Sequence, residues 1–178
     1  PSCTTTTGKG KNRTTITDET ICVEITAGGV DTLSTYPAGM ATSASMSVDG
    51  VAFASSAMEN SGNATGNTYN MGTAESTDSG ANGKVCVIER GVVSFHDKVN
   101  NCELSGGIGA VIYNNEPGML YGTLGDTNAT SIPAVGATQE DGAALTSATS
   151  IHINIGLSDY GFMSGTSMAT PAVSGIAA

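Results

Sequence analysis

Basic residues are scarce in this chain. Its 178 residues contain six Lys and Arg against sixteen Asp and Glu, which gives a net charge of −10. Nucleic acid and anionic membrane surfaces both reward clustered basic residues, so the sequence argues against either as a partner. Only 12% of residues are charged, yet 39% are hydrophobic and 24 are glycine. Disordered chains combine low hydrophobicity with high charge, so we expect a packed, loop-rich fold that contains β-strands.

Long apolar runs are also missing. No run approaches the roughly 20 residues that a membrane span needs, and no signal peptide opens the chain. The sequence therefore predicts a mature or excised soluble fragment.

Cysteines are few, and none forms a C-x-x-C pair. His96 and His152 lie far from any second cluster of ligands, so we expect no metal site. The even number and the spacing favour two disulfides, Cys3–Cys22 and Cys86–Cys102, and hence an oxidising compartment. Free buried thiols are the alternative. We expect a secreted protein.

The first half of the chain carries weak local signals. Alternating apolar and polar residues predict a strand at 21–26, an extended piece at 30–35 and one strand at Met46–Ala54. The rest of 37–82 is rich in Gly, Ser, Thr and Asn, which is typical of loops and turns.

The strongest local pattern lies between residues 84 and 114. Residues 84–88 predict a strand, and Ser94 with Asp97 predicts a capped helix start. Glycines at 106 and 107 end that helix, and 108–113 predicts a second strand. Strand, helix and strand in about 30 residues indicate a βαβ unit.

A second strand–helix–strand pattern follows, with weaker signals. Residues 132–135 are apolar, and Thr138 with Asp141 offers another helix start. Three isoleucines at 151, 153 and 155 alternate with polar residues and predict a half-buried strand. His152 would then be a solvated strand residue rather than a catalytic base.

The residues from 160 onward differ from everything before them. Gly165, Thr166 and Ser167 lead into Met-Ala-Thr-Pro and a small-residue helical stretch. Pro171 suits the first turn of a helix. Ser167 would then lie at the helix N-terminus, where unpaired N–H groups favour developing negative charge. The segment 165–171 resembles the nucleophile signature of the subtilisin-like serine proteases (subtilases), and the resemblance implies that Ser167 is the catalytic nucleophile.

A second resemblance covers the middle of the chain. Residues 84–115 read KVCVIERGVVSFHDKVNNCELSGGIGAVIYNN, and they are followed by I-P-A-V at 132 and D-G-A-A-L at 141. This resembles a protease-associated (PA) domain, whose pattern falls on Arg90, Gly91, Phe95, Lys98, Gly107, Ala110, Asn114, Pro133 and Gly142. The implied fold is β-rich α+β, a small sheet sandwich or barrel with short flanking helices, beside partial α/β subtilase segments.

Together the resemblances imply a domain plan and a function. Residues 1–45 would be a segment from the C-terminal half of the subtilase domain with a linker, 46–158 the inserted PA domain, and 159–178 the truncated subtilase segment with the nucleophile strand and helix. The parent would be a secreted serine endopeptidase that acts on protein or peptide substrates. This segment is expected to hold no cofactor, although the resemblance allows calcium in the parent enzyme. The alternatives are a non-catalytic module that binds proteins or peptides, and an unrelated adhesion or carbohydrate-binding domain.

A nucleophilic serine needs an adjacent base held by a third group. The family's D-[ST]-G and H-G-T-H motifs are not found here, since Asp78-Ser79-Gly80 lacks an apolar strand and no His-Gly pair exists. We therefore expect the chain alone to be inactive, with the catalytic Asp, His and oxyanion Asn supplied by the rest of the catalytic domain.

The predicted loop 114–128 is a candidate contact surface. Met119, Leu120 and Tyr121 place apolar groups among glycines, which favours a contact surface for extended protein substrate. The alternative is that these side chains fold back onto the domain's own core.

Overall fold

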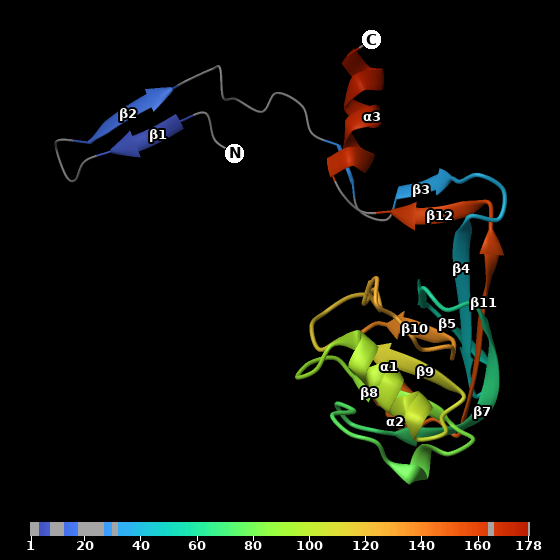
Figure 1. The fold of residues 1–178 in the computed structure, drawn as a ribbon. Helices are drawn as coiled ribbons and strands as arrows, with labels where there is room; N and C mark the ends of the chain where they lie inside the picture. The colour runs from blue at the N-terminus through green and yellow to red at the C-terminus, as the bar shows by residue number, and fades with distance from the viewer. Residues whose placement is uncertain (1–3, 8–12, 18–26, 30–31, 164–165, 178) are drawn as a thin grey trace. The chain divides into compact units, whose positions relative to one another are not determined.

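The computed structural model describes residues 4–7, 13–17, 27–29, 32–163 and 166–177 (Figure 1). The chain divides into two compact units, Thr35–Gly161 and the combination of Pro1–Ser34 with Phe162–Ala178. The predicted strand at 21–26 and the predicted bridge Cys3–Cys22 lie outside the described residues. Among the described residues, no helix combines the length and apolar character that a membrane crossing requires.

The larger unit is built on one eight-stranded sheet. Its order is β5-β4-β11-β7-β8-β9-β10-β6. The strands are β4 (Ala41–Val48), β5 (Val51–Phe53), β6 (Ser56–Met58), β7 (Gly62–Asn70), β8 (Val85–Glu89), β9 (Gly109–Tyr113), β10 (Ala134–Ala137) and β11 (Ser150–Ser158). The edge strands β5 and β6 are consecutive in sequence, and β4 also contacts β6. The sheet therefore curls into a nearly closed barrel, as the fold-class prediction allowed.

Two apolar layers hold the barrel together. Val85 and Val87 of β8 point into it, where they meet Val111, Ile151 and the other residues of the interior cluster. The alternating residues of β8 point outward and pack beneath helix α1 (Phe95–Leu104) (Figure 1). Because both faces of β8 and β9 are covered, these strands read as continuous apolar runs.

The predicted βαβ unit is confirmed. Strands β8 and β9 pair in parallel, and α1 connects them. Ser94 is the N-cap of α1, and its Oγ accepts a hydrogen bond from the backbone N–H of Asp97 at 3.1 Å. Gly106 follows the helix with φ +83°, a left-handed conformation that ends helices and favours glycine.

The second strand–helix–strand pattern, from residue 132 onward, also has the predicted form. Strand β10 pairs in parallel with β9, and helix α2 (Gly142–Ser147) follows it. Asp141 rather than Thr138 is the N-cap, and the backbone N–H of Asp141 donates to Thr138 Oγ1 at 3.1 Å. His152 is a half-exposed residue of β11, and its Nδ1 lies 2.6 Å from the hydroxyl oxygen of Thr65 on β7.

The prediction of one strand over Met46–Ala54 is wrong. Strand β4 ends at Val48, the chain turns at Asp49 and Gly50, and β5 returns antiparallel. Both turn residues have positive φ (+48° and +85°), as two-residue hairpins of this twist require. The prediction of loop over most of 37–82 is also wrong, because β7 lies between β11 and β8, and that pairing outweighs its weak β propensity.

The described part of the smaller unit is simpler. Strands β1 (Thr4–Thr7) and β2 (Thr14–Thr17) pair antiparallel. Helix α3 runs from Thr166 to Ala177. The predicted extended piece at 30–35 contains strand β3 (Thr32–Thr35), which pairs with β12 (Tyr160–Met163).

Candidate functional site

Ser167 lies in the first turn of α3, and its side chain is exposed. This is the position expected of a serine presented at a helix N-terminus. Gly165 lies outside the described residues. Among the described residues of this smaller unit there is no histidine, aspartate or glutamate. The role of Ser167 as nucleophile stays a prediction.

Pro171 does not lie in the first helical turn, contrary to the expectation. Helix α3 begins at Thr166, so Pro171 is inside the helix. A proline there leaves the carbonyl four residues earlier without its helical N–H partner, and that carbonyl belongs to Ser167. The sequence pattern located the helix but set its start too late.

The larger unit carries a second candidate site, at the loop between β8 and α1. In this loop Gly91 has φ +120° and Val92 has φ +65°. A β-branched residue rarely adopts positive φ, and such strain persists only where the surrounding structure fixes it. The Val92 side chain is 76% exposed, so the strain is not compensated by burial of this valine.

The first turn of α1 follows this loop, and together they form one wall of a groove. The Ser94 hydroxyl donates to Asp97 Oδ2 at 2.7 Å, and His96 Nδ1 lies 3.5 Å from the same carboxylate. The hydrogen bond from Ser94 is the main reason that the pKa of Asp97 lies below its ordinary value. The negative charge of Asp97 is thus held at the positive end of the helix.

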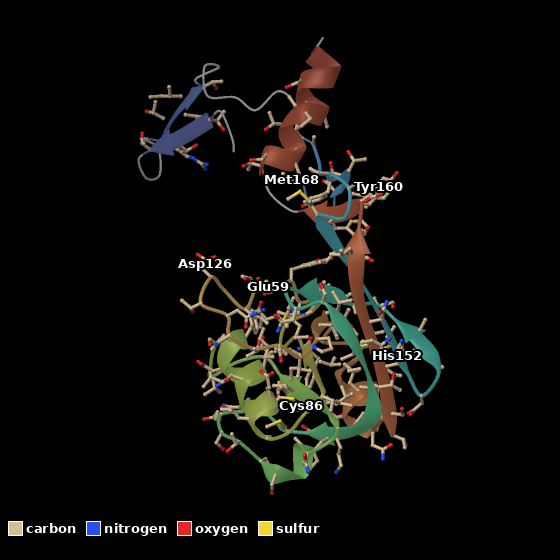
Figure 2. The ribbon with its side chains drawn as sticks, turned by 45° about the vertical axis from the view of Figure 1, so that its right-hand side comes forward. Glu59, Cys86, Asp126, His152, Tyr160 and Met168 are labelled. Atoms are coloured by element: carbon tan, nitrogen blue, oxygen red, sulfur yellow. A yellow bond between two sulfur atoms is a disulfide. The ribbon has the colours of Figure 1, made fainter. Side chains whose placement is uncertain are left out.

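The opposite wall is formed by residues from the segment 123–127. Glu59, just after β6, accepts hydrogen bonds from the Thr123 hydroxyl and from the Leu124 N–H, the latter at 2.5 Å. Figure 2 shows Glu59 and Asp126 at the same end of the domain. Asn60 Oδ1 accepts from Asn128 Nδ2 at 2.7 Å. These contacts fix a long loop that has no secondary structure of its own.

A groove of about 570 Å³ lies between the two walls. It is lined by Arg90, Gly91, Val92, Val93, Ser94, Phe95, His96 and Asp97 on one side and by Thr123, Leu124, Gly125 and Thr127 on the other. Its size is within the range of small-ligand sites. Arg90 and Phe95 were singled out by the sequence pattern, whereas Glu59 and Asn60 were missed.

The contact surface expected at 119–121 requires exposed side chains, and two of the three residues do not meet that requirement. Leu120 is 2% exposed and packs in the cluster beneath α1, and Met119 is half-buried. Tyr121 alone is 54% exposed. The apolar side chains of this loop mainly complete the domain's core.

Cys86 and Cys102 form the predicted disulfide, which joins β8 to α1. Both residues are fully buried. Nearby, the Lys98 side chain is also fully buried, and its Nζ donates to the carbonyl of Thr73. Burial lowers the pKa of Lys98, while the charges of Glu75 and Glu89 oppose that effect. Lys98 therefore anchors the loop before β8 to α1.

Comparison with known families matches residues 49–145 to the PA domain. The chain belongs to the PA domain family. The match covers more than half of the chain and includes both walls of the groove. The compact unit 35–161 extends beyond it on both sides, and the predicted domain boundaries at 46 and 158 stay predictions.

Relatives of this PA domain chain are peptidases. Leucine aminopeptidase 2 of Trichophyton equinum is 48% identical over 65 residues, 36% of this chain and 13% of that protein. The minor extracellular protease Vpr of Bacillus subtilis is 39% identical over 66 residues, 37% of this chain and 8% of that protein.

A solved structure shares the fold over a longer stretch. The subtilisin-like protease Apa1 of Pseudoalteromonas sp. AS-11 superposes with a TM-score of 0.64 at 25% identity. The match covers 84% of this chain and 41% of Apa1. The chain thus spans less than half of each of these peptidases.

Proposed function

We propose that this chain is part of a secreted subtilisin-like serine endopeptidase, with Ser167 as the nucleophile and the PA domain in contact with protein substrate. The observation that carries the proposal is the segment 165–171, G-T-S-M-A-T-P, with Ser167 exposed in the first turn of α3. The fold similarity to a subtilisin-like protease over most of the chain supports it.

The helix N-terminus supplies one of the two things that a nucleophilic Ser167 requires. An exposed serine at a helix N-terminus has unpaired N–H groups beside it, which stabilise an oxyanion. It still needs a base to remove its proton. In this proposal, the rest of the catalytic domain supplies that base and the aspartate that orients it.

Secretion is the second part of the proposal. A buried disulfide between β8 and α1 forms and persists in an oxidising compartment. The similarity to a protease named as extracellular agrees with that location.

An aminopeptidase is the second candidate, because leucine aminopeptidases have the higher identity over the matched residues. The two functions differ in what they require of the substrate. An aminopeptidase needs a free α-amino group, whereas an endopeptidase cleaves a peptide whose N-terminus is acetylated.

The test uses the complete protein that contains this chain. A fluorogenic peptide with an acetylated N-terminus should be cleaved, and Ser167→Ala should lower kcat by about a million-fold, the loss known for the nucleophile of subtilisin. Ser174→Ala, an exposed serine on the same helix, is the matched control and should keep full activity. Cleavage that requires a free N-terminus and survives Ser167→Ala would establish the aminopeptidase instead.

A further inference from the structure

Arg90 in the groove is a cation without a carboxylate partner. Its Nη1 donates to Asn114 Oδ1 at 2.8 Å. Among the described residues, no carboxylate lies within ion-pair distance of Arg90. A guanidinium has five N–H donors, so most of its donor capacity remains available. In a chain with sixteen acidic and six basic residues, an arginine left unpaired inside a groove calls for an explanation.

The side chain of Arg90 is held in place by a buried amide. Asn114 follows β9 and is 6% exposed. Its Oδ1 also accepts the N–H of Asn115 at 3.0 Å, and its Nδ2 donates to the carbonyl of Gly118 at 3.2 Å. The orientation of the amide is therefore fixed, and the amide fixes the guanidinium. A cation positioned in advance loses less entropy when it binds an anion.

The groove also presents apolar side chains on the wall that carries Arg90. Val92, Val93 and Phe95 line that side, and Val92 is 76% exposed, whereas Leu124 on the opposite wall is 3% exposed and packs in the core. Asp97 is the one carboxylate among the lining residues, and its charge is already met by Ser94 and the helix N-terminus. Arg90 is thus the cation of this groove, and in the described part of the chain its one side-chain partner is the neutral amide of Asn114, although the chain as a whole is strongly negative.

We propose that this groove binds an extended peptide that carries a carboxylate, with Arg90 as its ion-pair partner and Val92 and Phe95 in contact with its apolar side chains. The proposal rests on the proposed function in that the peptide would belong to a protein substrate. Planar guanidinium and carboxylate groups form paired hydrogen bonds, which gives such a site both charge and directional selectivity. The carboxylate can be a C-terminus or a Glu or Asp side chain.

The experiment measures binding of labelled hexapeptides to the full chain by fluorescence anisotropy at 0.15 M salt, where long-range repulsion is screened. One peptide is apolar with a free C-terminus, one has an amidated C-terminus and a central Glu, and one is amidated with a central Gln. At least one carboxylate peptide should bind about tenfold or more tightly than the neutral one, and which of the two binds identifies the source of the carboxylate.

Two variants and a control make the test specific. Arg90→Gln should weaken the carboxylate peptide by about 10- to 100-fold and leave the neutral peptide unchanged. Arg13→Gln makes the same charge change at the chain's other arginine and should have no effect. Thr127→Glu adds a negative charge at an exposed position on the opposite wall, so it should also weaken the carboxylate peptide, while the thermal midpoint confirms that each variant folds.

Equal affinity for all three peptides, no binding at millimolar concentration, or full affinity in Arg90→Gln would overturn the proposal. These outcomes leave the Ser167 test untouched, because that test measures cleavage of a peptide by the complete protein. Loss of the endopeptidase proposal would equally leave the measured peptide affinities standing.

Discussion

The disulfide between β8 and α1 lies against a glycine, and this contact predicts a coupled effect on stability. A Cβ built on Gly107 would overlap Cys102 Sγ, lie 2.7 Å from Cys86 Sγ and lie 2.8 Å from the Cys102 carbonyl oxygen. Real Cβ atoms do not approach other atoms so closely, so Gly107→Ala must displace the bridge. Overpacking of this kind costs about 1–3 kcal/mol.

Removing the bridge has its own cost. The cysteines are 16 residues apart in sequence, and a loop of about this size is worth roughly 3 kcal/mol in the chain-entropy model. Domains of this size have unfolding free energies of about 5–15 kcal/mol, so Cys86→Ala/Cys102→Ala should fold but with reduced stability. Without the two sulfur atoms, the two contacts of the new Cβ at 2.7 Å or less are gone and the carbonyl of residue 102 remains, so the cost of alanine at 107 should fall by about 1 kcal/mol or more.

The assay is urea unfolding followed by circular dichroism, for the wild type, Gly107→Ala, the double cysteine variant and the triple variant. Gly156→Ala is the control, because nothing lies within 4 Å of a Cβ at that position. The reasoning fails if the double variant loses less than about 1 kcal/mol, or if Gly107→Ala costs the same free energy with and without the bridge.

Two further predictions concern the groove walls. Glu59→Gln replaces a charged acceptor by a neutral one at the Leu124 N–H, so that amide should exchange with deuterium about tenfold faster, whereas amides of β9 keep their rates. The pKa of Asp97 is lowered in the folded state, so the unfolded state binds more protons just below the ordinary carboxyl value of about 4. The stability that Asp97 provides is therefore present above pH 4 and lost as the pH falls further. Urea midpoints of Asp97→Asn should depend less steeply on pH between 4 and 2; an unchanged slope would contradict the assignment.

The βαβ unit was predictable because its signals are local. Ser94 and Asp97 mark the start of α1 within four residues, glycines mark its end, and the apolar runs on either side are long enough to be strands. The pairing of Cys86 with Cys102 follows from the same unit, since the helix lies over the strand that precedes it.

The strands before residue 70 were not predictable in the same way. Strand β7 reads GNATGNTYN, whose threonines and tyrosine favour a strand only weakly against its glycines and asparagines, so its partners on both sides decide its conformation. Those partners, β11 and β8, are supplied by distant parts of the chain. Asp-Gly at 49 and 50 is a common hairpin signal, but apolar residues continue on both sides of it, so the sequence pattern predicted one strand across the turn.

The groove shows the same division between local and distant signals. Arg90 and Phe95 belong to a recognisable local pattern, so sequence reasoning named them. The opposite wall depends on Glu59 reaching residues 123 and 124, more than 60 positions away, and no local pattern contains such a contact. When one wall of a site is a local motif and the other is a distant loop, the sequence predicts only the residues of the local motif.

The path of the chain into and out of the larger unit bears on how this domain could be inserted into an enzyme. Ala41 at the start of β4 pairs with Ser158 at the end of β11. The N–H of Tyr36 donates to the carbonyl of Asp159 at 2.8 Å, and the N–H of Gly39 donates to the Asp159 carboxylate at the same distance. Because the two ends of the unit are adjacent, a host fold could accept it without separating its own flanking residues. Residues before 46 belong to this pairing, so if the proposed function holds we expect the insertion to begin near residue 35 and end near residue 161.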